Sequence, residues 1–206
     1  FGLDLQQFVP GSKEAARERL GIFPGQTVIA LRALEGPYKG LEYVKDALHR
    51  IQTKQPLCIL TTQQKGTLDE FIGKFQIVEL GWTNDEELMI ASLQAADFFI
   101  MPSTAEAFGL MAAEAMACGR PVICFQGTSL PDVTFAPDAG LAVPARDSAA
   151  LAAAMTRWIE NPEEVEKRGR RSREIAEAHY GVDLYVERLA AVYRSAVERR
   201  QPKIAA

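Results

Sequence analysis

Residues 98–125 read FFIMPSTAEAFGLMAAEAMACGRPVICF and contain one complete strand–helix–strand unit. The apolar run at 98–101 predicts a strand, which is followed by a proline. The Ala- and Met-rich stretch at 109–118 predicts a helix that ends at Gly119. A second apolar run at 121–125 predicts the next strand. Because neither run alternates apolar with polar residues, both strands are expected to be buried on two faces, as in a parallel sheet.

The same alternation of short apolar runs and helical patterns extends over the preceding residues. Strands are predicted at 27–33, 57–62, 77–80 and, further on, 141–143, and helices at 41–51, 68–75 and 83–95. The last of these helices is expected to open with a capping box formed by Thr83 and Glu86. Right-handed crossovers between about six strands give an α/β fold, a Rossmann-like doubly wound parallel sheet.

Beyond the sheet the chain becomes helical, with helices predicted at 147–160, 162–179 and from 183 to about 200. Charges of both signs fill residues 163–173, and this pattern predicts a solvated helix face. Residues 1–206 are interpreted as a single domain with C-terminal helices.

Composition narrows the class of protein. The 206 residues carry a formal net charge of −4 without a strongly basic block, which argues against nucleic acid as the main partner. The apolar runs fall short of the ~20 residues that span a membrane. Because the sequence opens on Phe1 rather than Met, we expect it to be a piece of a longer protein.

The three cysteines, Cys58, Cys118 and Cys124, each lie in an apolar run and lack CxxC spacing. This pattern predicts buried thiols rather than disulfides or a zinc site, and it favours an intracellular setting. Only two histidines are present, far apart in the sequence, so no metal site is expected.

Ligands of open α/β sheets bind beyond the carboxyl ends of the strands. Arg32 and Lys39 follow the first predicted strand, and Gly109 opens a helix after the fourth. Two cations and the free N–H groups of a helix start favour an anion, and a diphosphate with about two negative charges would fit. The alternative is that both cations are ordinary surface charges.

Glu106 and Glu114 add two carboxylates to the same region. Glu106 precedes the helix, whereas Glu114 lies inside it among apolar residues. An inward-facing Glu114 would be costly without a partner, and the hydroxyls of a ribose are one such partner. The alternative is an exposed glutamate, or one paired with a nearby arginine.

Both glutamates belong to one long stretch of sequence that resembles a known signature. The pattern Pro102-Ser103-x-x-Glu106-x-Phe108-Gly109-Leu110-x-x-x-Glu114, continued to Gly119-x-Pro121, resembles the signature of family 4 ("group 1") glycosyltransferases. It matches the second, nucleotide-sugar-binding domain of their GT-B fold. Lys39-Gly40 and Leu80-Gly81 match further turns of that domain, so the resemblance covers nearly the whole chain.

The resemblance implies a retaining transfer of a sugar from a nucleotide donor to an acceptor. It gives the catalytic roles to Glu106, Lys39 and Arg32. The two cations would neutralise the departing diphosphate without a required metal or other cofactor. Glu106 would bind hydroxyls of the transferred sugar or stabilise an oxocarbenium-like centre.

The remaining site residues are implied to bind the donor. N–H groups of the loop would support phosphate and sugar, Glu114 would bind the ribose, and two further residues would contact the base. These donor-binding candidates are Phe108, Gly109, Leu110, Glu114, Trp82 and Thr83.

By the same resemblance, residues 1–12 correspond to the segment that enters this domain, and the helix over 183–206 returns toward a missing N-terminal domain. That missing half would bind the acceptor (a sugar, lipid or small molecule), so the isolated fragment is expected to be inactive. The expected location is the cytoplasm, with peripheral association at the inner face of a membrane left open. Two alternatives remain: a non-catalytic nucleotide-sugar-binding module, and a sugar-nucleotide epimerase on the related fold.

Overall fold

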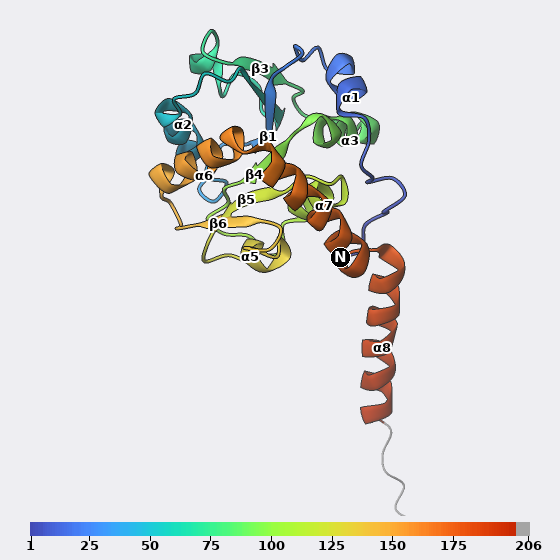
Figure 1. The fold of residues 1–206 in the computed structure, drawn as a ribbon. Coiled ribbons are helices and arrows are strands. Elements are labelled where there is room, and N and C mark those ends of the chain that lie inside the picture. The colour runs from blue at the N-terminus through green and yellow to red at the C-terminus, as the bar shows by residue number, and fades with distance from the viewer. Residues whose placement is uncertain (201–206) are drawn as a thin grey trace, which may run out of the picture.

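The computed structural model describes residues 1–200, in which six strands form one sheet. The strands are β1 Thr27–Ala33, β2 Leu57–Gln63, β3 Gln76–Glu79, β4 Phe98–Met101, β5 Val122–Phe125 and β6 Leu141–Val143. All neighbouring strands are parallel, in the order β3-β2-β1-β4-β5-β6 (Figure 1). This order confirms the predicted doubly wound sheet, and it reverses direction between β1 and β4.

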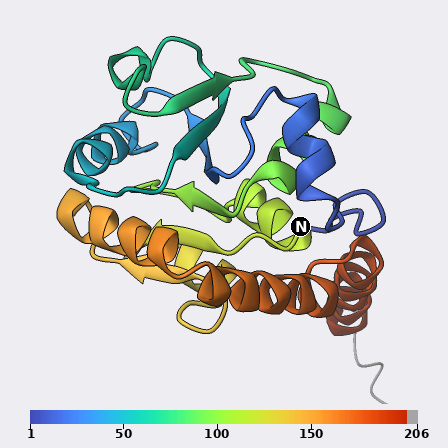
Figure 2. The same ribbon diagram turned by 45° about the horizontal axis from the view of Figure 1, so that its top comes forward.

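Helices alternate with the strands, and all of them except α8 pack around the sheet. They are α1 Lys13–Arg19, α2 Leu41–Arg50, the short 3-10 helix η1 Asp69–Phe71, α3 Glu86–Ala95, α4 Leu110–Ala117, α5 Leu130–Val133, α6 Ser148–Glu160, α7 Pro162–His179 and α8 Val182–Arg200. Figure 2 shows α6 and α7 following one another along one side of the molecule.

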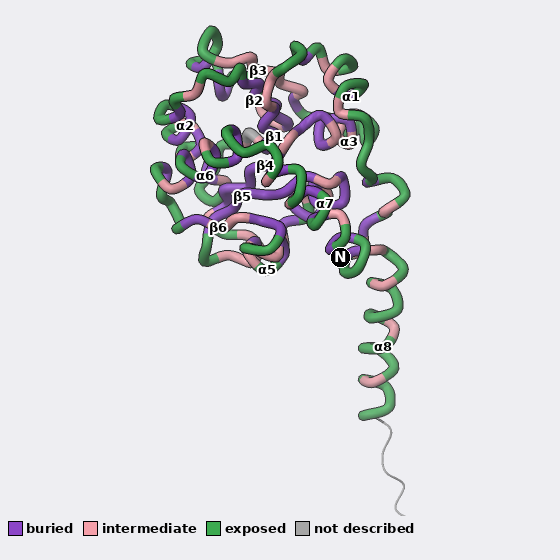
Figure 3. Tube along the Cα trace, in the orientation of Figure 1, coloured by how far each residue is buried: buried purple, intermediate pink, exposed green. Residues whose placement is uncertain are grey.

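The β1 sequence accounts for this layering because successive side chains of a strand point to opposite faces. Val28 and Ala30 pack into one core with α1, α3 and α4, whereas Ile29 and Leu31 pack into the other with α2 and α6. Figure 3 shows the inner strands as the buried centre between helices that are partly exposed, whereas the edge strands β3 and β6 are only partly buried.

Helix α7 joins the two cores. Val165 near its start packs into the core of α2 and α6, and Ile175 near its end packs into the core of α4. The prediction that residues 163–173 form a solvated face of this helix is only partly correct. The guanidinium groups of Arg168 and Arg173 turn inward and donate hydrogen bonds to carbonyl oxygens of Gly140 (3.1 Å) and Ala117 (2.8 Å). Long cationic side chains thus fix loops rather than only facing solvent.

Two local predictions are wrong. Helix α3 is capped by Asp85, whose carboxylate accepts a hydrogen bond from the Leu88 N–H, so Thr83 and Glu86 form no capping box. The helix expected over 68–75 is reduced to η1, because Gly73 at φ 93° turns the chain. Helices α1 and α5 were not predicted.

Helix α8 projects away from the rest of the molecule (Figure 1). The end of α7 and the chain start lie together: Leu3 N–H donates to the Tyr180 carbonyl (2.7 Å), and Val182 N–H donates to that of Leu3 (2.9 Å). Tyr185, Val186 and other apolar side chains of α8 remain exposed. The last part of the helix predicted over 183–206, residues 201–206, lies outside the described residues.

Candidate functional site

The loops that follow β1 and β4 meet where the strand order reverses. Thr104 N–H donates a hydrogen bond to the Tyr38 carbonyl (2.9 Å). Gly40 adopts φ 69° and lies so close to the carbonyl oxygen of Pro102 that a Cβ atom would not fit. A side chain at this position would therefore be excluded both by backbone conformation and by space. The two loops form one rigid edge.

Across this edge, Lys39 faces Glu106. The Lys39 ammonium lies 3.4 Å from Glu106 Oε2, and the Ser103 hydroxyl donates to the same oxygen (3.4 Å). The side chains of Lys39 and Glu106 are 28% and 18% exposed. Partial burial strengthens such a pair relative to one on the open surface. The structure thus joins two residues that lie 67 positions apart in the sequence.

Arg32 lies in the same region. Its side chain lines a small hollow together with Lys39, Ser103 and Met111. Arg32 is half-buried and forms no ion pair with another residue of the described chain. Since Lys39 is paired with Glu106, the charge of Arg32 is the uncompensated one at this hollow.

The start of α4 supplies backbone donors. Gly109 adopts φ 96° and packs on the end of the Leu130 side chain, so a side chain at this position would strain the backbone and displace Leu130. Within residues 1–200, no acceptor is hydrogen-bonded to the N–H groups of residues 108–111. Such free N–H groups at a helix start favour a bound anion. The Phe108 ring packs on Phe1 and Tyr180, so only the backbone N–H of Phe108 is left to bind an anion.

Ser129 is a residue that sequence reasoning missed. Its hydroxyl bridges the carbonyl oxygens of Glu106 (3.1 Å) and Phe108 (3.2 Å) and so ties the loop after β5 to the loop after β4. The sequence feature that could have identified Ser129 as a site residue is its position just beyond the carboxyl end of a predicted strand.

Glu114 lies one helical turn beyond Met111, which lines the hollow, and residues three apart share a helix face. Burial raises the pKa of the Glu114 carboxyl to about 7, and the negative charge of Glu86 adds to the effect. No side chain of the described residues is bonded to this carboxyl. The alternative of an arginine partner for Glu114 is therefore not met within the described part of the chain, where the carboxyl is half-buried and unpaired.

Trp82 and Thr83 are not brought to Lys39 and Glu106. Trp82 is 72% exposed in the loop after β3. The Thr83 hydroxyl accepts a hydrogen bond from the Asp85 N–H (3.0 Å). This loop is linked to the end of β2 by the Gln63 N–H, which donates to the Gly81 carbonyl (2.9 Å).

The three cysteines are buried and free, as predicted. Burial raises the pKa of Cys58 and Cys118 to about 12 and that of Cys124 to about 11. These thiols are protonated and unreactive near neutral pH. Within residues 1–200, no group of three or more His, Cys, Asp or Glu side chains is placed to hold a metal ion.

A sequence model of the family "Glycosyl transferases group 1" matches residues 12–175. The chain belongs to this family of glycosyl transferases. It is 29% identical over 220 residues to a D-inositol 3-phosphate glycosyltransferase of Saccharomonospora viridis, covering 96% of this chain and 51% of that protein. The chain thus spans about half the length of that relative.

Solved structures share the group 1 fold. Sucrose-phosphate synthase from Thermosynechococcus elongatus superposes with a TM-score of 0.79 at 26% identity, over 96% of this chain and 52% of the other. HepE of Anabaena, in complex with UDP-glucose, gives a TM-score of 0.80 at 20% identity, over 94% of this chain and 56% of that one. The predicted family and its Rossmann-like GT-B sheet are confirmed.

In the described part of this glycosyl transferase family member, no helix combines the length and the apolar character needed to cross a membrane.

Proposed function

We propose that this chain is the donor-binding half of a retaining glycosyltransferase, which transfers a sugar from a nucleoside-diphosphate sugar to an acceptor. The main support is the contact between Lys39 and Glu106 where strand order reverses, 3.4 Å between ammonium and carboxylate. Ligands of doubly wound sheets bind at this reversal. Membership of the group 1 family and the UDP-glucose bound to HepE support the same assignment.

Lys39 and Arg32 would hold the diphosphate of the donor. As the glycosidic bond breaks, the leaving nucleoside diphosphate gains negative charge, and the two cations would stabilise it as it develops. The free N–H groups of Phe108, Gly109 and Leu110 would add hydrogen bonds to phosphate and sugar. In this scheme no metal or other cofactor is required.

Glu106 would act on the transferred sugar. Lys39 and Ser103 hold one oxygen of its carboxylate, and the other oxygen is left for sugar hydroxyls or for the positive charge of an oxocarbenium-like centre. We propose that sugar transfer at this site retains the configuration of the anomeric carbon.

Glu114 would bind the ribose. A carboxyl with a pKa of about 7 accepts hydrogen bonds when ionised and donates one when protonated, and ribose hydroxyls satisfy either form. Trp82 and Thr83 would contact the base, with the exposed indole of Trp82 as a stacking surface.

The second half of the protein would bind the acceptor, a sugar, lipid or small molecule. Residues 1–12 and 183–206 would connect to it, because the start of the chain and the start of α8 lie together at Leu3 and Val182. The exposed apolar side chains of α8, among them Leu189, would be covered there. We place the protein in the cytoplasm, with any membrane contact made peripherally through that other half.

The test is calorimetric titration of the full-length protein with UDP-, GDP- and ADP-sugars. One of these donors is expected to bind, and Lys39→Ala together with Glu114→Ala is expected to weaken binding at least tenfold. Lys45→Ala is the matched control, since Lys45 is a paired lysine on α2 that contacts Glu70 instead.

Binding that is unchanged in the double variant, or absent for every donor, would refute the proposal. Donor conversion without any acceptor would instead identify a sugar-nucleotide epimerase. Donor binding with no product in the presence of acceptors would identify a non-catalytic binding module.

A further inference from the structure

Two larger cavities lie at the opposite edge of the sheet from Lys39 and Glu106. Their volumes are about 500 and 480 Å³, and they adjoin, because Lys13, Asp97, Val165 and Glu166 line both. Asp97 directly precedes β4 and Arg120 lies just before β5, so the pair of cavities opens at the amino ends of the strands.

Arg120 is the unusual residue of this region. It lines the second cavity, yet it is only 6% exposed. Its Nε atom is buried without a hydrogen-bond partner, and its guanidinium forms no ion pair with any of residues 1–200. An unpaired buried guanidinium is costly, and arginine does not escape the cost by losing its proton.

The position of Arg120 is fixed by the end of α4. Its N–H donates to the Ala115 carbonyl (2.8 Å), and the Gly119 N–H donates to that of Met116 (2.9 Å), with Gly119 at φ 73°. These paired bonds form the Schellman motif that ends many helices. The side chain of Arg120 therefore leaves a rigid turn and is held at the cavity.

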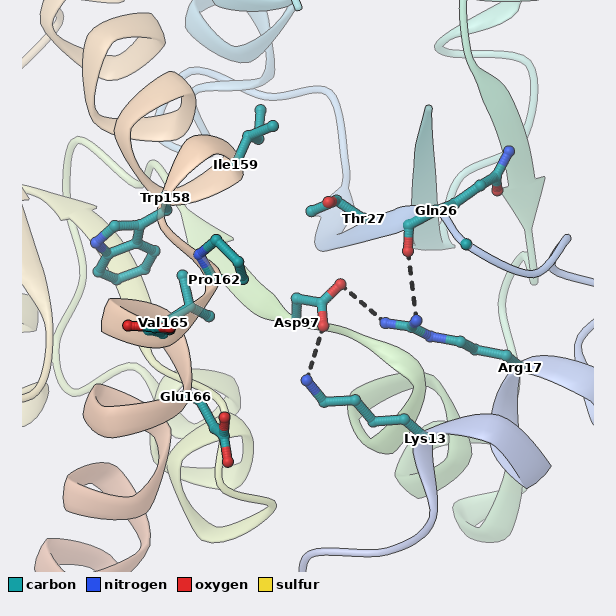
Figure 4. Close-up of a pocket in the computed structure, with 12 residues that line it drawn as sticks. Lys13, Arg17, Gln26, Thr27, Asp97, Trp158, Ile159, Pro162, Val165 and Glu166 are labelled. Carbon is teal, nitrogen blue, oxygen red and sulfur yellow. Dashed lines mark hydrogen bonds and ion pairs between the residues drawn. The ribbon is translucent and has the colours of Figure 1, made fainter. Parts of the chain in front are cut away.

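Three of the four acidic groups around the two cavities are already engaged by other cations. Asp97 accepts from both Lys13 (2.7 Å) and Arg17 (2.8 Å), as Figure 4 shows. Glu166 is paired with Arg170 (2.8 Å). Glu174 is paired with Arg171 (3.0 Å), whereas Glu163 forms no ion pair within residues 1–200.

A simple charge count follows from these pairs. Lys13 and Arg17 together bring two positive charges to the single negative charge of Asp97, which leaves one in excess. Arg120 adds a second positive charge that no described side chain neutralises. Glu163, which also lines the first cavity, brings one negative charge that is paired with no cation of residues 1–200. The joined cavities therefore carry about one positive charge in excess, which favours a bound anion.

We propose that these cavities form a second anion site, which takes a phosphate group as inorganic phosphate or as a small phosphate monoester. The planar guanidinium of Arg120 would bind two phosphate oxygens at once. Lys13, which lines both cavities and contacts Asp97 (Figure 4), would approach a third. A cavity of about 480 Å³ leaves room for the organic part of a monoester. This site is independent of donor binding, because it lies at the other edge of the sheet.

The experiment is calorimetric titration of the chain with inorganic phosphate and, separately, with glycerol 3-phosphate, at constant ionic strength set with chloride. We expect saturable binding by at least one of the two, and at least tenfold weaker binding for Arg120→Gln. Arg120→Gln is expected to bind the nucleotide-sugar donor like the unmodified protein, which separates this site from the donor cleft. Arg194→Gln, on the exposed surface of α8, is the charge-matched control.

A second readout does not depend on a substitution that alters folding. In NMR spectra of the arginine side chains, phosphate is expected to shift the Nε–H signal of Arg120, identified by its loss in Arg120→Lys. Tighter binding of glycerol 3-phosphate would indicate a monoester, and tighter binding of inorganic phosphate a free anion. Equal phosphate binding by Arg120→Gln and the unmodified chain, loss of donor binding in Arg120→Gln, or an unshifted Arg120 signal would overturn the proposal.

Discussion

Gly40 lies directly against the carbonyl oxygen of Pro102, and this close approach joins the loop after β1 to the loop after β4. The approach requires a residue without a Cβ atom and a backbone in the left-handed region, φ 69°. The ion pair between Lys39 and Glu106 lies next to this contact in the sequence and in space. The packing of Gly40, together with the hydrogen bond from Thr104 N–H to the Tyr38 carbonyl, therefore brings the two charged loops of the site together.

Gly40→Ala is predicted to destabilise the protein by about 2–4 kcal/mol, since a new methyl group must push two backbone segments apart. Urea unfolding measures the change. Gly25→Ala is the matched control, because Gly25 has a similar φ of 76° with no atom within 4 Å of the added Cβ. This control is expected to lose only about 1 kcal/mol from backbone strain. Equal losses for the two variants would contradict the close-packing argument.

The stability of the protein is predicted to depend on Glu114 between pH 4.5 and 7. Burial raises the pKa of this carboxyl from 4.5 to about 7, so the unfolded chain ionises first as pH rises. The folded state then loses stability relative to the unfolded state, and the loss is complete above pH 7. Glu114→Gln removes this cost.

The free energy of unfolding of Glu114→Gln is expected to equal that of the unmodified chain below pH 4.5. At pH 8 it is expected to be larger by on the order of 2 kcal/mol, a value reduced for solvent screening because the position is only half-buried. Urea unfolding of both proteins at several pH values tests this. A stability difference that stays constant across the range would show that Glu114 ionises normally.

Glu106→Gln in the full-length enzyme is predicted to lower turnover more than donor affinity. Its carboxylate is held by Lys39 and Ser103 at the proposed sugar position, and removing its charge affects the charged transition state most. Steady-state kinetics gives kcat, and titration with the donor gives its dissociation constant. A loss confined to donor binding, with kcat unchanged, would contradict the role proposed for Glu106.

Gly169→Ala is predicted to destabilise the protein by about 1–2 kcal/mol, although alanine is the better helix former by about 1 kcal/mol. The reason is that α7 packs on the end of α4 at this point, and a Cβ atom on Gly169 would meet the carbonyl oxygen of Gly119. Thermal unfolding provides the measurement. Lys167→Ala, at an exposed position of the same helix, serves as control; a stabilised Gly169→Ala variant would show that the helices move apart without cost.

The strands were predictable because each is a short apolar run that packs on both faces. Residues 98–101 and 141–143 match β4 and β6 in both bounds. Helix starts were less predictable, because several neighbouring residues can cap. Asp85 rather than Thr83 caps α3, since its carboxylate is the one placed to accept from the Leu88 N–H.

Missed elements had weak or short signals. Helix α1 begins at a serine cap, Ser12, whose hydroxyl accepts from the Ala15 N–H (3.2 Å), and that signal was available in the sequence. Helix α5, Leu130–Val133, contains only four residues, too few for a helical period to appear.

The sequence by itself determined the layers of this protein, its family and the types of residue at its site, because burial on two faces and the glycine turns are local properties of the chain. Only the tertiary structure decided which charges meet. It pairs Lys39 with Glu106, and it leaves Arg120 buried without a partner. Such pairings depend on how segments far apart in the sequence pack, and no local pattern records the distance between two side chains or the water that burial removes from them.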